Sequence, residues 1–292
     1  MHIPVLKDEV IRFLNPQANE NFIDATFCQG GYATAILMKN GPEGRVLGIE
    51  VDPVLYEKAL NEKKGISRLL LINSSYTKLE DIVKRTNFYP VHGIVFDLGV
   101  SSWHFQESGR GFSFQKSEKL DMRYDPRQEL SAFEIVNRWS ADELEEILKR
   151  WGEERFSRRI SRMIVEERKK QPIETTCQLS EIISKAVPAW YRRKRIHCAT
   201  RTFQALRIAV NNELENASEG IKAGIKLLVA GGRIVVVSFH SLEDRIAKYI
   251  FKEKAAEGIL KILTKKPVCP SESEIQKNPS SRSAKLRAAV KL

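Results

Sequence analysis

Apolar and polar positions form alternating blocks along the first hundred residues, and the blocks have the lengths of strands and helices. Continuous apolar runs occupy residues 21–27, 44–50, 69–73 and 91–97, as is typical of strands buried on both faces of a sheet. Between these runs the apolar spacing predicts helices, for example from residue 79 to 85. This alternation predicts an α/β fold with a doubly wound, mostly parallel sheet.

The pattern changes after residue 126. Residues 127–207 show helical spacing and no convincing strand, and Ser140 with Glu143 forms a capping-box pattern at one helix start. Strand-like and helix-like segments then return. Within residues 127–207 we expect helices at 140–148, 155–170 and 178–186, and a long helix at 205–228 follows. We then expect a buried strand at 231–240, a helix at 242–255 and a last edge strand at 284–290. We therefore expect an α/β core at 1–126 and 208–292, interrupted by a helical domain at 127–207.

Three of the predicted strands end in a carboxylate. Asp24, Glu50 and Asp97 each follow an apolar run, and Gly30-Gly31 forms a turn after the first. Carboxyl ends of parallel strands meet at one edge of the sheet, so this pattern predicts a cleft for a nucleoside-bearing cofactor. A tight turn and a solvated strand end remain the alternatives.

The identity of the cofactor follows from two details of that cleft. Glu50 lies 20 residues after Gly30, where a carboxylate accepts ribose hydroxyls and repels a 2′-phosphate. The turn Cys28-Gln29-Gly30-Gly31 is not the G-x-G-x-x-G that cradles a pyrophosphate. S-adenosyl-L-methionine is therefore favoured over a dinucleotide.

Charge points to a polyanionic partner. The chain has 48 Lys and Arg against 37 Asp and Glu, a net charge of +11. Between residues 149 and 196 there are 14 basic against 6 acidic residues, and we expect the clusters there to contact RNA phosphates, with Trp190 and Tyr191 as stacking partners. An ordinary solvated helix face is the alternative. The candidate RNA-binding residues are Arg155, Arg158, Arg159, Arg162, Arg192, Arg193, Lys194 and Arg195.

Several classes of protein are disfavoured. No apolar run approaches the roughly 20 residues of a membrane span, and the first residues do not resemble a signal peptide. The cysteines at 28, 177, 198 and 269 form neither a C-x-x-C pair nor a His/Cys cluster. We expect reduced thiols, no metal and a cytoplasmic location.

A series of motifs, spread from residue 2 to residue 287, resembles one known family. This family is the bacterial 16S rRNA (cytosine-N4)-methyltransferases, RsmH (MraW). The motifs are His2-Ile-Pro-Val-Leu6, Asp97-Leu-Gly-Val-Ser-Ser102, Arg110-Gly-Phe-Ser-Phe114, Leu120-Asp-Met-Arg123, Gly152-Glu-Glu-Arg-Phe156, Ala199-Thr-Arg-Thr-Phe-Gln-Ala-Leu-Arg207, Ser238-Phe-His-Ser-Leu-Glu-Asp-Arg245 and Asn278-Pro with Arg282-Ser-Ala-Lys-Leu-Arg287.

The resemblance implies a class I methyltransferase core with an inserted helical substrate-recognition domain. It further implies transfer of a methyl group from S-adenosyl-L-methionine to N4 of a cytidine in the decoding region, with small-subunit rRNA as partner, in an assembled or nearly assembled subunit. Whether the protein forms a homodimer is left open. The implied cofactor-binding residues are Gly30, Gly31, Tyr32, Glu50, Tyr76, Asp97 and His104.

The chain departs from the family pattern at several positions. Cys28 replaces a usual glycine, Tyr32 a histidine, Glu50 an aspartate, His104 a glutamine and Cys198 a proline, while Ser117-Glu-Lys119 replaces Asp-Gly-Pro. If residue 28 needs a positive φ, a cysteine there costs roughly 1–2 kcal/mol relative to glycine. A non-catalytic RNA-binding factor on the same fold, or a methyltransferase for proteins or small molecules, are therefore alternative functions.

Candidates for the catalytic step are few. Asp97 is the first, either as acceptor of the N4 proton or as a ligand of the cofactor, and His240 with Asp244 follows a late strand. His240 has an alternative role in bonding backbone, and Asp244 one in starting a helix. His2 and His197 are weaker candidates, and Phe112 and Phe114 are either core residues or base-stacking residues.

Overall fold

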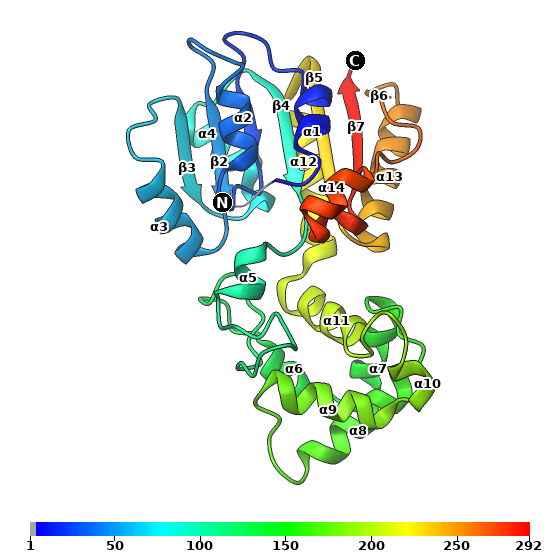
Figure 1. The fold of residues 1–292 in the computed structure, drawn as a ribbon. Coiled ribbons are helices and arrows are strands. Elements are labelled where there is room, and N and C mark those ends of the chain that lie inside the picture. The colour runs from blue at the N-terminus through cyan, green and yellow to red at the C-terminus, as the bar shows by residue number, and fades with distance from the viewer. Residues whose placement is uncertain (1–3) are drawn as a thin grey trace. The chain divides into compact units, whose positions relative to one another are not determined.

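The protein forms two compact units in a computed structural model that describes residues 4–292 (Figure 1). One unit contains the described residues up to Gly99 together with Leu214–Leu292, and the other contains Val100–Glu213. His2, a weak candidate from the sequence, lies outside the described residues. Within the described part, no helix has both the length and the apolar character that crossing a bilayer requires.

The first unit is built on a seven-stranded sheet in the order β3-β2-β1-β4-β5-β7-β6. All pairings among β1 to β5 are parallel, and only β7 runs against its neighbours. This confirms the predicted doubly wound, mostly parallel sheet. The strands are β1 (Phe22–Asp24), β2 (Val46–Glu50), β3 (Leu69–Asn73), β4 (Val91–Asp97), β5 (Leu228–Ser238), β6 (Leu260–Ile262) and β7 (Lys285–Lys291).

Helices cover both faces of this sheet because successive strand residues point to opposite sides. Val95 packs in a core with α1 and α2, whereas its neighbours Ile94 and Phe96 pack in a second core with α4, α12 and α13. Figure 1 shows α1 and α2 in front of the strands. The helices of this unit are α1 (Lys7–Leu14), α2 (Gly31–Leu37), α3 (Pro53–Glu62), α4 (Leu79–Thr86), α12 (Glu213–Leu227), α13 (Ser241–Ala256) and α14 (Glu272–Lys277), with 3-10 turns η1 (Tyr76–Lys78) and η2 (Pro279–Ser283).

Two predictions about elements of the chain were wrong. The long helix expected over 205–228 is broken at Asn212, whose φ of 47° is left-handed, so α11 ends before α12 begins. Asparagine tolerates this conformation better than most residues, and the apolar spacing continues across a one-residue break. The expected edge strand at 284–290 is instead paired on both sides, because the three-residue β6 covers its outer side.

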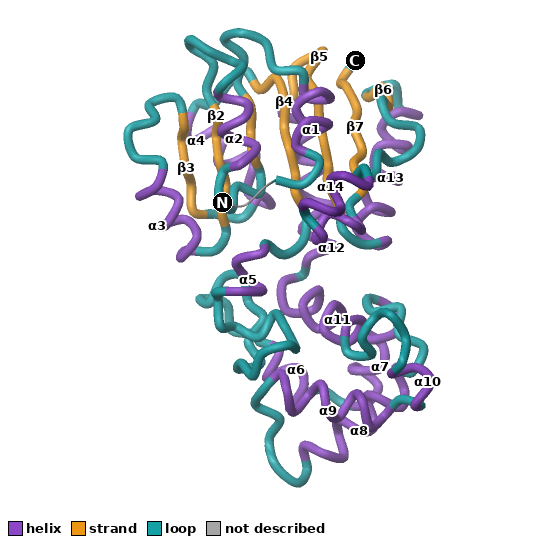
Figure 2. Tube along the Cα trace, in the orientation of Figure 1, coloured by secondary structure: helices purple, strands orange, loops and turns teal. Residues whose placement is uncertain are grey.

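The second unit is helical, and its described residues contain no strand beyond one isolated bridge (Figure 2). Its apolar core includes Phe112, Leu120 and Met122, which explains why the unit begins before the expected residue 127. Ser140 and Thr175 each complete a capping box at a helix start. The helices are α5 (Ser102–Gln106), α6 (Ala132–Arg138), α7 (Ala141–Arg150), α8 (Ser157–Arg168), α9 (Thr176–Ala186), α10 (Ala189–Arg192) and α11 (Thr200–Asn211).

Candidate active site

The three strand-end carboxylates meet at one edge of the sheet. Asp24 is level with Gly48 of β2 on one side and with Val95 of β4 on the other. Glu50 and Asp97 therefore each stand two residues further along the neighbouring strands. Strand order runs outward in one direction from β1 and in the other from β4, so the group lies at the topological switch point of the sheet, where α/β proteins bind ligands.

A compact turn connects β1 to α2 beside these carboxylates. Gly30 has φ 70°, and a Cβ there would lie 2.3 Å from Cζ of Phe27. A Cβ on Gly31 would lie 2.2 Å from Cγ of Pro4. Neither glycine can be replaced without displacing the side chain of Phe27 or Pro4, which occupies the space that a Cβ would need. Cys28 has φ 49°, so this position does require the left-handed conformation that favours glycine.

Asp24 is fully buried at the centre of the group. Its Oδ2 accepts a hydrogen bond from the amide of Ala33 at 3.2 Å, and its Oδ1 one from the amide of Thr26 at 3.4 Å. Burial raises the pKa of Asp24 to about 7, although both hydrogen bonds lower it. Asp24 was absent from the predicted site residues. Its place at a strand end beside two other acids was the signal that could have identified it.

Glu50 is held by backbone amides on both sides. Its Oε2 accepts from the amide of Cys28 and its Oε1 from the amide of Asp52, each at 2.8 Å. Burial raises the pKa of Glu50 to about 7, the two amides lower it, and the charges of Asp52 and Asp24 add to the rise. Each carboxylate oxygen has a second lone pair, so Glu50 can still accept ribose hydroxyls.

Asp97 differs from the other two acids in having an oxygen with nothing to bind. Its Oδ1 is buried without a hydrogen-bond partner, although the residue as a whole is partly exposed. Burial raises the pKa of Asp97 well above its usual value. The charges of Asp24 and Glu243 add to the rise, and the nearby Tyr32 hydroxyl lowers the pKa. A buried oxygen without a donor is costly, which makes it a ready partner for an N–H donor or a cation.

Tyr32 contributes its side chain as well as its place in the turn. The residue is 4% exposed, and its hydroxyl donates to the carbonyl oxygen of Val5 at 2.5 Å. Burial raises the pKa of Tyr32 well above 10, with the charges of Asp97 and Asp24 adding to the rise. The hydroxyl is thus neutral, and its single proton is donated to Val5 in the segment before α1. The sequence does not reveal this hydrogen bond, because Val5 precedes Tyr32 by 27 residues.

Tyr76 stands three residues after β3, next to the strand that ends in Glu50. Its half-buried ring contacts Phe96 edge-on, with centroids 5.7 Å apart. A Cβ on Gly220 of α12 would lie 2.5 Å from Cδ2 of Tyr76, so the helix backbone approaches the ring closely. These contacts fix the orientation of the ring, and a role of Tyr76 in cofactor binding stays a prediction.

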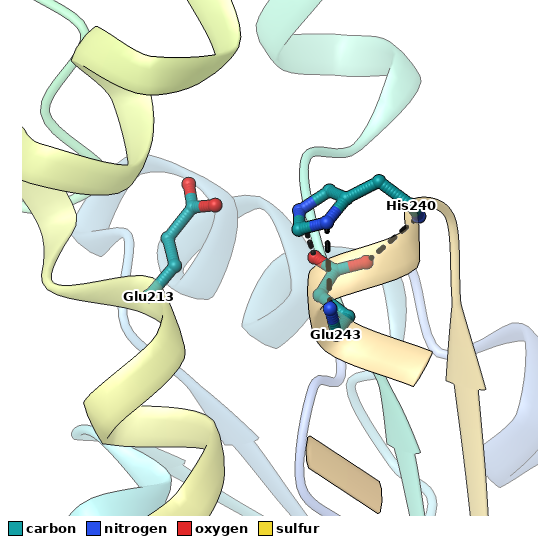
Figure 3. A group of neighbouring side chains, drawn as sticks. All are labelled: Glu213, His240 and Glu243. Atoms are coloured by element: carbon teal, nitrogen blue, oxygen red, sulfur yellow. Dashed lines mark hydrogen bonds and ion pairs between the residues drawn. The ribbon is translucent and has the colours of Figure 1, made fainter. Parts of the chain in front are cut away.

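His240 begins α13, where its local contacts are those of a helix cap (Figure 3). Its Nδ1 accepts from the amide of Glu243 at 3.4 Å, and its own amide donates to Oε2 of Glu243 at 3.3 Å. Nε2 lies at an ion-pair distance of 3.1 Å from Oε1 of Glu243 but makes no hydrogen bond. The capping role therefore occurs in the structure, and a catalytic role for His240 stays a prediction.

Asp244 is occupied by an ion pair. Its Oδ1 and Oδ2 accept from Nε and Nη2 of Arg287 at 2.6 and 3.1 Å, and both residues are buried. This pair joins α13 to β7, which gives Asp244 a structural task. Glu213, also drawn in Figure 3, belongs to the helical unit, where it pairs with Arg207 at 2.8 Å.

His104 lies in the helical unit rather than in the unit with the three carboxylates. It is 4% exposed, and Nδ1 lies 2.7 Å from Oγ of Ser101. The rings of Trp103, Phe112 and Tyr124 surround it with centroids 5.2, 4.9 and 5.1 Å away. A role of His104 in cofactor binding therefore stays a prediction, while Phe112 is a core residue.

The candidate RNA-binding cations are all exposed. They lie in two groups, at residues 155–162 around the start of α8 and at residues 192–195 around the end of α10. None of these eight described side chains forms an ion pair within the chain. Both groups flank Phe156, Trp190 and Tyr191, which contact one another. His197 is exposed and stacks on Phe114 with centroids 4.6 Å apart.

The sequence matches the MraW methylase family over residues 1–292. The chain belongs to the MraW methylase family. Its strand order, with β7 antiparallel, is that of class I methyltransferases, as the resemblance implied. Among curated members, a protein named ribosomal RNA small subunit methyltransferase H from Persephonella marina is 49% identical, covering 100% of this chain and 99% of that protein.

Two further proteins similar to this chain are a curated relative and a solved structure. The protein of the same name from Thermomicrobium roseum is 46% identical, covering 100% of this chain and 94% of that protein. A solved structure titled as a rRNA methylase from Streptococcus thermophilus is 11% identical with a TM-score of 0.46, covering 98% of this chain and 93% of that chain.

Proposed function

We propose that this MraW methylase transfers a methyl group from S-adenosyl-L-methionine to N4 of a cytidine in the decoding region of 16S rRNA. The group of three carboxylates beside a glycine turn, in a member of a methylase family, is the observation that carries this proposal. The relatives, named as small-subunit rRNA methyltransferases, support the substrate.

The sheet edge fits this cofactor in charge and in shape. Gly30 adopts a left-handed conformation that turns the chain tightly beside the carboxylates, so backbone amides of the turn can bind a methionine moiety. Glu50 retains lone pairs for the ribose hydroxyls, and the unpartnered Oδ1 of Asp97 can accept from an ammonium group. The cofactor carries positive charge, which would compensate the negative charge of the buried carboxylates.

The transfer forms a bond between N4 and the methyl carbon, breaks the bond from that carbon to sulfur, and releases a proton from N4. When bound, the cofactor supplies a methyl group made electrophilic by the sulfonium. Asp97 is our first candidate to accept the N4 proton, because a carboxylate with a raised pKa is a stronger base once it is ionised. Its alternative task is to hold the cofactor. His240 is the second candidate.

The helical unit supplies the contacts to RNA in this proposal. The exposed cations at 155–162 and 192–195 neutralise phosphates, and the substrate is an assembled or nearly assembled small subunit in the cytoplasm. A domain that recognises RNA by its backbone needs such unpaired cations, and these eight have no acidic ion-pair partner among residues 4–292.

One assay tests the activity. The protein is incubated with cofactor labelled in its methyl group and with small subunits that lack the modification, and the labelled nucleoside is mapped. We expect a single labelled N4-methylcytidine in the decoding region, and free rRNA serves as the comparison substrate. Cofactor binding without transfer to any RNA would instead favour the non-catalytic RNA-binding factor.

A further inference from the structure

The most exposed tryptophan of the helical unit, Trp190, is held against two other rings. Trp190 is 49% exposed on α10, and it contacts Phe156 and Tyr191 at centroid distances of 5.9 and 5.7 Å. Phe156 and Tyr191 also contact each other, at 4.9 Å. All three pairs are edge-on, so the three rings support one another and leave part of the indole in solvent.

Tyr191 fixes this aromatic cluster to the body of the unit. It is 7% exposed, and its hydroxyl donates to Oε2 of the buried Glu154 at 2.9 Å. Burial raises the pKa of Tyr191 to about 12, with the hydrogen bond to Glu154 adding to the rise, so the hydroxyl stays protonated and continues to donate. The Glu154 carboxylate is therefore buried and already accepts a hydrogen bond from Tyr191.

Flexible cations lie over the same rings. The Arg155 guanidinium is 5.8 Å from the Trp190 ring centroid, and Nζ of Lys194 is 5.1 Å from it. Arg159 lies 5.9 Å from the Phe156 centroid. These side chains are long and exposed, so a flat group that stacks on the indole can displace one of the cations from the ring. The displaced cation can then bind a neighbouring phosphate.

We propose that Trp190 is a stacking platform for an unpaired RNA base, with Arg155 and Lys194 binding the phosphates on either side of that base. The proposal rests on the proposed function, because it adds to an RNA-methylating enzyme the class of RNA it binds, namely single strand. A duplex keeps its bases stacked inside the helix, where a side chain at the surface cannot stack on them. An exposed indole among cations fits an unpaired base and its phosphates.

The test compares single-stranded and duplex RNA of roughly ten nucleotides. Both contain no cytidine, so binding cannot depend on methyl transfer, and affinity is measured by fluorescence anisotropy at several salt concentrations. The variants are Trp190→Leu, which keeps an apolar side chain, and Trp190→Phe, which keeps a ring. Tyr249→Leu is the matched control, since Tyr249 is 59% exposed beside Lys248 but lies in the other unit.

We expect Trp190→Leu to lower single-strand affinity about 5- to 100-fold, the range measured for base–aromatic stacking. Its salt slope and duplex affinity should stay unchanged, and Trp190→Phe and Tyr249→Leu should bind nearly as the original protein does. An equal loss on duplex, or no loss on single strand, would overturn the proposal. Were Trp190→Leu unfolded by circular dichroism, quenching of tryptophan fluorescence by single-stranded RNA decides instead, because Trp190→Phe should abolish most of it.

The outcomes separate this inference from the proposed function. If Trp190→Leu left the single-strand affinity unchanged while the original protein methylated the subunit, the enzyme assignment would stand and only the platform would be refuted. If Trp190→Leu lowered the single-strand affinity as expected but the original protein methylated no RNA, the platform would stand and the enzyme assignment would be refuted. The protein would then be an RNA-binding protein that is not a methyltransferase.

Discussion

At the scale of single residues, Asp97 is the group whose surroundings are least complete. A native structure keeps few buried polar atoms without a partner, and such atoms concentrate where a ligand or reactant supplies the missing bond. Oδ1 of Asp97 is one of three such side-chain atoms among the described residues, and it alone lies beside the glycine turn. The carboxylate thus contributes less to the fold than to what binds there.

Replacing Asp97 should therefore remove activity without unfolding the protein. We expect Asp97→Ala to keep its thermal unfolding midpoint within a few degrees, because Oδ1 has no bond to lose and no core cavity forms. Methyl transfer should fall by at least about 100-fold, as for removal of a preorganised charge-stabilising group. Calorimetry and the labelled-methyl assay measure the two effects. A folded variant with near-original turnover would exclude Asp97 as acceptor and as cofactor ligand.

Cys28 gives the second prediction at this scale. Its φ of 49° strains a non-glycine residue, so Cys28→Gly should relieve roughly 1 kcal/mol. We expect tighter cofactor binding by at most about ten-fold, since 1.4 kcal/mol corresponds to a factor of ten. Titration calorimetry compares this variant with Cys28→Ser, which keeps a Cβ and therefore the strain. Unchanged or weaker binding in Cys28→Gly would show that the turn has adapted to cysteine.

At the scale of elements, sequence patterns predicted those that have a strong period or a continuous apolar run. The strands at 69–73 and 91–97 have the bounds predicted for them. The pattern failed at the break at Asn212, where one left-handed residue leaves the apolar period intact, and at the three-residue β6, which is too short to give a signal. Local periodicity encodes the repeat of an element and not its interruptions.

The features of the candidate site also differ in whether a local sequence pattern could predict them. Glu50 and Asp97 could be predicted because their distinguishing feature, a carboxylate at a strand end, is local in sequence. The side-chain role of Tyr32 could not, since its partner Val5 precedes it by 27 residues. The occupation of Asp244 by Arg287 was equally hidden, as the two are 43 residues apart. Contacts between residues distant along the chain determine which of these polar groups already have a partner within the protein.

The ends of β1 and β2 should make stability depend on pH in an unusual direction. The pKa values of Asp24 and Glu50 rise from 3.8 and 4.5 to about 7 in the folded protein. Between about pH 4 and 7 the folded state therefore holds more protons than the unfolded state, and the free energy of unfolding should fall as pH rises. Above about pH 7 it should level off.

The variant Asp24→Asn tests this pH dependence of stability directly. The amide cannot ionise, so the variant should lose part of the decline in stability between pH 4 and 7 and be at least as stable as the original protein at pH 8. Urea unfolding at several pH values measures this, with the exposed Asp142→Asn as control. Cofactor affinity of the original protein should rise from pH 6 to 8, because ionised carboxylates attract its positive charge. A stability that rises with pH in this range would contradict the raised pKa values.

At the scale of the whole molecule, the excess positive charge determines how RNA is bound. The net charge of +11 is not spread evenly, and Arg192, Arg193, Lys194 and Arg195 form its densest run. Cations that neutralise phosphates release counterions, so the affinity for RNA should fall by roughly 0.7–0.9 log units per log unit of salt for each contact.

Replacing these four residues with serine should weaken binding to target and unrelated RNA alike and flatten the salt slope. Cofactor affinity should not change, since the four residues belong to the helical unit and the carboxylates to the other. Filter binding across a salt series, with calorimetry for the cofactor, measures both. A variant that keeps its salt slope but loses target discrimination would make the cluster a base-reading element.

Synthesis of the helical unit delays completion of the sheet. β4 and β5 pair along most of their length, yet residues 98–227 separate them in the chain. A ribosome that adds roughly 5–20 residues per second takes on the order of ten seconds to make that stretch. Throughout this interval the apolar strand Val91–Asp97 has one edge without its partner, the state in which strands join those of other chains. We therefore expect this strand edge to be open to pairing with other chains while the helical unit is being synthesised.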